Sequence, residues 1–107
     1  MATGIEHPSV VDLVTLDSTS QEVALIMVAA APWTDDKVLE LQAKTNAYLR
    51  YYESGQLWKA YPDLVGKRVR IQLDTSYPLS ELANQFVNVA TEEWLKPLGL
   101  RFAILEV

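Results

Sequence analysis

Apolar residues recur along this chain first as the short aliphatic runs of strands and then with the spacing of helices. The segments Val10–Asp17 and Glu22–Ala29 are rich in aliphatic and β-branched residues, and Ser-Thr-Ser-Gln separates them. Two such runs joined by small polar residues predict a β-hairpin. The segment Ala-Ala-Ala-Pro-Trp comes next and ends the second strand.

From Asp36 to Ser54 the apolar residues follow a helical period. Thr34 or Asp35 can cap the start of this helix, and Gly55 stands where a left-handed residue ends a helix at little cost. Placed at about 100° per residue, one stripe of the helix carries the residues expected to be buried: Val38, Leu41, Thr45, Tyr48, Leu49 and Tyr52.

The second half of the chain repeats the alternation of strand and helix. Gln56–Gly66 predicts one short helical turn stopped by Pro62, and Lys67–Asp74 alternates apolar and polar residues as a strand does. Leu79–Leu95 predicts a second helix, and Leu100–Val107 predicts a last strand. The apolar stripe of the second helix comprises Leu79, Leu82, Ala83, Phe86, Val89, Ala90 and Trp94.

The predicted order is therefore ββαβαβ. Crossovers between parallel strands are right-handed in nearly all proteins, so two successive crossovers place both helices on one side of the sheet. We expect an α/β fold of the α+β kind, a two-layer sandwich with a four-stranded mixed sheet and both helices on one face. The 107 residues form a single domain, residues 1–107, with a flexible segment over residues 1–8.

The opposite face of this sheet has no helix to cover it. On the hairpin, the side chains expected on that outer face are apolar, and Arg68 and Arg70 border them on the third strand. An exposed apolar patch with a charged border is typical of a protein contact, although a terminal segment or a barrel-like curl could also cover it. The predicted contact residues are Val14, Leu16, Ala24, Ile26 and Val28.

Composition narrows the functional classes. The absence of cysteine excludes disulfides and thiolate metal sites, and the net charge of -5 argues against nucleic-acid binding. No apolar run is long enough to span a bilayer, and the N-terminus lacks the features of a signal peptide. We therefore expect a cytoplasmic protein without a membrane or nucleic-acid partner.

No motif of catalytic or cofactor chemistry stands out. The single histidine, His7, lies in the segment predicted to be flexible, and Asp35 and Asp36 are adjacent acids of the kind that favour a helix start. Phosphate loops and dinucleotide fingerprints are also missing. We expect a protein that is not an enzyme and that uses no cofactor or metal.

Two polar groups remain as candidate sites. Arg68, Arg70 and Arg101 can share the open face and contact an anionic group, or they can form a cross-strand charge ladder, which we consider the better interpretation. The ladder acids would be Asp12, Glu22, Asp74 and Glu106. On the first helix a polar shelf can bind a ligand or, as we expect, hold the loop that follows Gly55. The shelf comprises Gln42, Asn46 and Glu53.

Several of these residues also carry a resemblance that covers nearly the whole chain. Its most specific part is the pattern LQAKTNAYL, ESGQ and YP between Leu41 and Pro62. The pattern further includes Trp33 with its following acids and Pro78. It is similar to a family of small bacterial proteins catalogued as a domain of unknown function. That resemblance implies a stand-alone domain and transfers no activity, cofactor or site.

Two functional hypotheses follow. The first is a non-enzymatic protein that acts through protein contact as a homodimer, with the outer sheet face as its interface. The alternative is a small-molecule binding domain with a polar site between the first helix and the Gly55–Pro62 loop.

Overall fold

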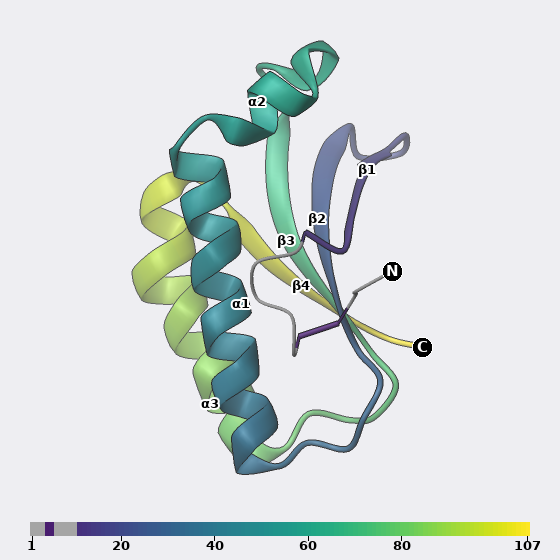
Figure 1. The fold of residues 1–107 in the computed structure, drawn as a ribbon, viewed down its shortest axis with the longest axis vertical. Coiled ribbons are helices and arrows are strands. Elements are labelled where there is room, and N and C mark those ends of the chain that lie inside the picture. The colour runs from purple at the N-terminus through teal and green to yellow at the C-terminus, as the bar shows by residue number, and fades with distance from the viewer. Residues whose placement is uncertain (1–3, 6–10) are drawn as a thin grey trace.

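A single four-stranded sheet forms the centre of the molecule (Figure 1). The computed structural model describes residues 4–5 and 11–107. The strands lie in the order β1-β2-β3-β4, and β1 is antiparallel to β2 while the other neighbours are parallel. Their bounds are β1 Leu13–Asp17, β2 Glu22–Ala29, β3 Arg68–Thr75 and β4 Arg101–Glu106. The predicted mixed sheet is therefore confirmed.

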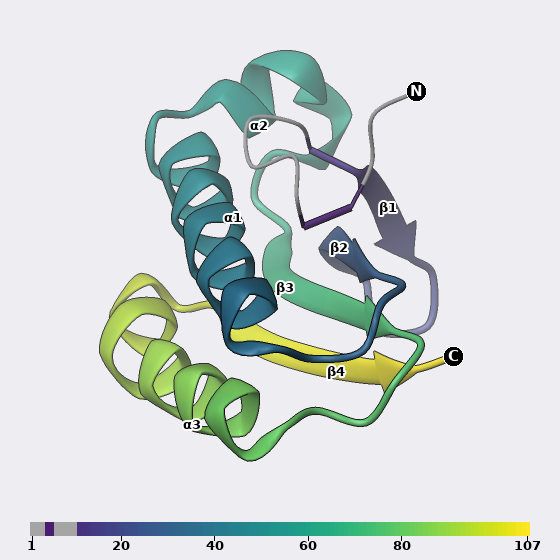
Figure 2. The same cartoon turned by 60° about the horizontal axis from the view of Figure 1, so that its bottom comes forward.

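The two long helices cover one face of this sheet, as the turned view shows (Figure 2). α1 spans Asp35–Glu53 and α3 spans Glu81–Ala90, while the short α2, Gln56–Ala60, lies beyond the end of α1. A 3-10 turn, η1, follows α2 at Pro62–Leu64. This arrangement confirms the predicted two-layer α+β fold.

The predicted start and end signals of α1 are present. The Thr34 side chain accepts a hydrogen bond from the Lys37 backbone N–H at 3.3 Å, and Gly55 has a φ of 82° directly after the helix. The buried stripe runs from Val38 to Leu49, and it includes Lys44, which the apolar pattern left out.

The second helix is shorter than predicted. α3 ends at Ala90, and the chain continues through a π-helical turn, η2 (Thr91–Leu95), and a 3-10 turn, η3 (Lys96–Leu98). The stripe prediction is wrong at two positions, because Leu82 and Val89 are exposed and Val87 is buried instead. Ala83, Phe86, Val87 and Ala90 also have helical spacing, so the sequence pattern alone allowed either stripe.

Alternate residues of β2 and β3 face the helices and form the core with Leu41, Tyr48, Phe86 and Ala90. Gly4 and Ile5 are buried as well, although the sequence placed both in a flexible segment. The Ile5 backbone N–H donates to the Val28 carbonyl at 3.1 Å, which ties these residues to β2. His7 and the other residues of that segment lie outside the described ranges.

Candidate functional site on the open face of the sheet

The strand registers define which side chains lie on the sheet face opposite the helices. Leu13 pairs with Ile26, Ile26 with Gln72, and Gln72 with Ala103. Because directly paired residues of neighbouring strands point to the same face, every second residue from these positions belongs to it. We call this surface the open face: Leu13, Thr15 and Asp17; Glu22, Ala24, Ile26 and Val28; Arg68, Arg70, Gln72 and Asp74; Arg101, Ala103 and Leu105.

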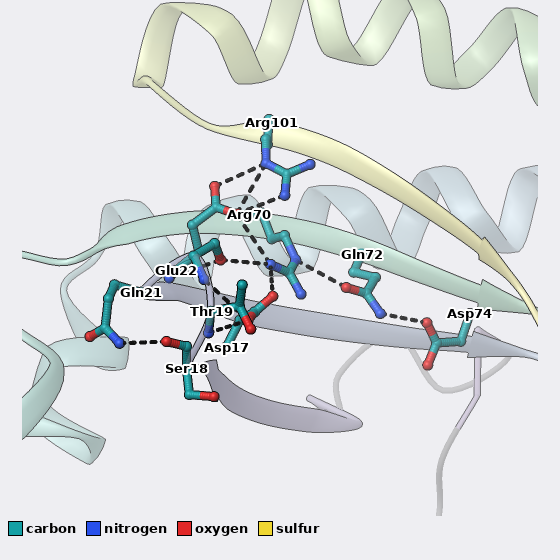
Figure 3. A network of polar contacts seen from close by, with 10 residues as sticks. Asp17, Ser18, Thr19, Gln21, Glu22, Arg70, Gln72, Asp74 and Arg101 are labelled. Carbon is teal, nitrogen blue, oxygen red and sulfur yellow. Dashed lines mark hydrogen bonds and ion pairs between the residues drawn. The ribbon is translucent and has the colours of Figure 1, made fainter.

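Ion pairs link all four strands at the hairpin end of the open face (Figure 3). Glu22 is at the centre, with its Oε1 2.7 Å from Arg101 Nη2 and 3.1 Å from Arg70 Nη1. The same Arg70 nitrogen lies 3.0 Å from Asp17 Oδ2. Arg70 Nε donates to Gln72 Oε1 at 3.0 Å, and Gln72 in turn donates to Asp74 at 2.7 Å.

These contacts lower the pKa values of Asp17 and Glu22. The Arg70 guanidinium and the backbone N–H groups of Thr19 and Ser20 lower the pKa of Asp17 to about 2. The pKa of Glu22 also falls to about 2, mainly because Arg101 donates to it. In return, the Glu22 carboxylate raises the pKa of Arg101. Asp17, Glu22 and Arg101 are therefore charged at neutral pH.

The three predicted arginines do come together, and two of them share one carboxylate. Arg70 and Arg101 bind Glu22, and Arg68 is exposed next to Glu22 in the register. A cross-strand ladder is therefore present, but its acids differ from the prediction. Asp17 takes part, whereas Asp12 is buried beside Lys44 and the register places Glu106 on the helix side. A contact with an external anionic group stays a prediction.

The predicted face is wrong for two contact residues. Val14 pairs with Leu25 and Leu16 with Val23, so both side chains point toward the helix side. The physical reason is the hairpin register, because a shift of one residue turns every side chain of a strand to the opposite face. Leu13 is on the open face instead and is 49% exposed.

The other three predicted contact residues are on the open face, but two of them are covered. Ala24 is fully buried and Ile26 is 7% exposed. In the register Ala24 lies beside Arg70 and Ile26 beside Gln72. The Arg70 side chain extends across β2 to Asp17 of β1, whereas the Gln72 amide bonds to Arg70 and Asp74 of its own strand. Val28 is exposed, and so is Leu105 at 49%, which the sequence reading did not include.

The polar shelf of α1 faces away from the Gly55–Pro62 loop. Asn46 and Glu53 line a hollow of about 300 Å³ beside Trp94, and Gln42 lines a neighbouring one of about 270 Å³ that Trp94 also borders. Within the described part of the chain, no hydrogen bond joins the three shelf side chains to that loop. The expectation that the shelf holds the loop is therefore wrong.

The start of the loop borders a different hollow, on the other flank of α1. This space of about 340 Å³ is lined by Ser54 and Gln56, by residues of α1 that include Tyr51, and by Val11, which precedes β1. The shelf and the loop are thus separated by the helix, so they do not combine into the single ligand site that the small-molecule hypothesis requires.

A comparison with protein families finds a match that covers nearly the whole chain, as the resemblance in the sequence does. The model of a family described as a "Family of unknown function (DUF6572)" matches residues 3–106. The chain belongs to this family. No curated protein and no solved structure matches the chain. The bacterial origin expected from the resemblance stays a prediction.

This DUF6572 chain shows neither a membrane-spanning helix nor a metal-binding cluster among its described residues. Among the described residues, the helices are either too short or too polar to cross a bilayer. In the same ranges, acidic and histidine side chains do not gather in a group of three or more that could hold a metal ion.

A buried polar cluster was missed by the sequence reading. Lys44 is fully buried, and its Nζ lies 2.6 Å from Asp12 Oδ1 and 2.6 Å from the Gly4 carbonyl oxygen. Asp12 also accepts the backbone N–H groups of Gly4 and Val28, both at 3.0 Å. The hydroxyl of Tyr48 accepts the Asp12 N–H at 2.8 Å and donates to a β2 carbonyl.

One signal in the sequence could have revealed this cluster. Lys44 lies three residues after Leu41 and four before Tyr48, which is the spacing of the buried stripe of α1. A lysine in such a stripe requires a buried partner, and Asp12 occurs inside the first apolar run. The cluster joins the N-terminal residues, β2 and α1, so we assign it to stability.

Proposed function

We propose that this DUF6572 protein is not an enzyme and acts through protein contact, and that the open face is the surface by which two copies associate. The observation that carries the proposal is a side of the sheet that neither long helix covers and that exposes large apolar side chains at Leu13 and Leu105. Both long helices lie on the other side (Figure 2), and Leu13 and Leu105 each leave 49% of their surface exposed on the open face.

The charge distribution favours a second copy as the occupant. The open face carries three acids, Asp17, Glu22 and Asp74, and three of the chain's four arginines. Its formal charge is therefore zero, whereas the whole chain carries -5. Two copies repel each other least when they meet through a neutral surface.

The arrangement of these charges is also self-complementary. Arg68 and Arg101 lie at the hairpin end of the open face, and Asp74 lies toward the other end. A two-fold axis parallel to the sheet can bring Asp74 of one copy toward the arginines of the other, as a symmetric dimer requires. The ion pairs of Glu22 hold Arg70 and Arg101 in place before contact, which reduces the entropy lost on association.

The test is the molar mass of the wild type and of Leu13→Glu by light scattering at tens of micromolar. Leu13 is exposed, so the substitution leaves the fold intact but places an acid in the contact, and we expect it to halve the mass of the assembly. Leu39→Glu is the matched control, because Leu39 is 61% exposed on α1 and away from the open face. A wild-type monomer, or an unchanged mass for Leu13→Glu, would contradict the proposal.

A further inference from the structure

β4 is an edge strand, and its backbone leaves one side unpaired among the described residues. The sheet order places β3 on one side of β4 and ends there. The backbone N–H of Val107 donates to the Thr75 carbonyl of β3 at 2.9 Å. Because successive residues of a strand direct their backbone groups to opposite sides, residues 101, 103, 105 and 107 face β3. The N–H and C=O groups of Phe102, Ile104 and Glu106 therefore point away from the sheet.

This edge lacks the features that usually prevent strands from pairing with other chains. Natural edge strands carry lysine, proline or a bulge, or are very short. The sequence of β4, Arg-Phe-Ala-Ile-Leu-Glu, has neither lysine nor proline, and its pairing with β3 is regular over six positions. Its apolar side chains are exposed on both faces, with Ile104 on the helix side and Leu105 on the open face.

We propose that β4 pairs antiparallel with β4 of a second copy of this chain, centred on Ile104 opposite Ile104. A two-fold axis perpendicular to the sheet keeps open-face residues opposite open-face residues. Centred on Ile104, it pairs all the outward backbone groups, because Phe102 then lies opposite the partner copy's Glu106 and Ile104 opposite itself. A centre on Ala103 leaves Glu106 without a strand residue opposite it.

The side chains agree with this register. On the helix side Ile104 lies opposite Ile104 of the second copy. It also borders a hollow of about 410 Å³ lined by Leu79 and Asn84 among others. On the open face Leu105 lies opposite Ala103, and Arg101 lies opposite Val107. Like charges therefore do not face each other, which favours the pairing. The contact is separate from the open face but continuous with it, since the two open faces become one surface.

Single cysteines test the register directly, because the chain has no cysteine of its own. In the proposed pairing the Ile104 Cα atoms are about 5.5 Å apart, within the range that a disulfide spans. The Leu105 Cα atoms are about 7–8 Å apart or more and fall outside it. Each substitution is made together with Leu13→Glu, which removes the open-face contact. Under mild oxidation we expect Ile104→Cys to form a covalent dimer and Leu105→Cys to remain single.

A second variant measures the contact without cross-linking. Ile104→Pro removes an outward N–H and keeps the bonds to β3, a position where edge strands accept proline. We expect it to halve the mass of the assembly, both alone and together with Leu13→Glu. Three results would overturn the proposal. The first is that Ile104→Cys forms no covalent dimer, the second is that Leu105→Cys cross-links as readily as Ile104→Cys, and the third is that folded Ile104→Pro keeps the mass of the wild-type assembly. The open-face proposal is judged separately, by Leu13→Glu alone.

Discussion

The buried pair of Lys44 and Asp12 gives the sharpest stability prediction. Both side chains are at most 1% exposed, and the Nζ to Oδ1 distance is 2.6 Å. Lys44→Met keeps much of the side-chain volume and removes the positive charge, so the carboxylate of Asp12 stays buried without its counter-ion. Removing one partner of a buried pair costs about 3–5 kcal/mol. The N–H groups of Gly4 and Val28 still bond the carboxylate, so we expect the lower part of that range.

The chain contains a matched control. Lys96 Nζ lies at the same distance, 2.6 Å, from Glu92 Oε1, but these side chains are 59% and 63% exposed. An exposed pair contributes about 0–1 kcal/mol, because water screens the charges. Lys96→Met should therefore change stability little, although the substitution and the distance are the same. The comparison isolates the effect of burial.

Urea unfolding followed by tryptophan fluorescence measures both variants. With slopes of about 1–3 kcal/mol per molar urea, a loss of about 3 kcal/mol lowers the midpoint by about 1 M or more. The double variant Lys44→Met with Asp12→Asn removes both charges and should lose less than the sum of the single losses. If Lys44→Met were no more destabilising than Lys96→Met, the buried pair would not stabilise the fold as argued.

Two further predictions concern the acids and the buried tyrosine. The pKa of Glu22 is about 2 in the folded chain, lower than the value of about 4.3 for an unfolded glutamate. The contribution of Glu22 to the free energy of unfolding is therefore complete above about pH 4.5 and is lost as the pH falls toward 2. The stability difference between wild type and Glu22→Gln, from urea unfolding, should therefore shrink over that window, and a constant difference would contradict it. Tyr48→Phe leaves the Asp12 N–H and the Ile26 carbonyl without their partner and should cost about 1–3 kcal/mol by the same assay. Burial raises the pKa of Tyr48, so an alkaline absorbance titration below the unfolding pH should be the same for both proteins.

The fold could be predicted because its signals are local. The alternation in β3, the stripe of α1 and the stop at Gly55 each depend on a few neighbouring residues. The handedness of crossovers then placed both helices on one side. The end of α3 was less predictable, since Trp94 continues the apolar spacing although the backbone widens to a π-helical turn at Thr91.

The open face was predicted only in part, because it depends on register. The sequence indicates that β1 and β2 form a hairpin, but which face Val14 occupies depends on the pairing of Asp17 with Glu22 across the turn. An error of one residue reversed the whole strand. The exposure of Ile26 was also overestimated, since a sequence pattern gives the face of a residue but not how much of its surface stays exposed there, which is 7% for Ile26.

The two proposed contacts are compatible in one closed assembly. The axis of the β4 pairing is perpendicular to the sheet, and the axis of the open-face contact is parallel to it. Two perpendicular two-fold axes that cross generate a tetramer with D2 symmetry, a common form among homo-oligomers. Pairing at Ile104 first joins two open faces into one larger surface, and Leu13 and Leu105 of both copies then face the second pair. Either contact alone gives a dimer. Leu13→Glu should therefore halve the mass of the assembly if the open-face contact forms, and Ile104→Pro should halve it if the β4 contact forms. A chain that carries both substitutions should be a monomer of 12.0 kDa whichever contacts the wild type uses.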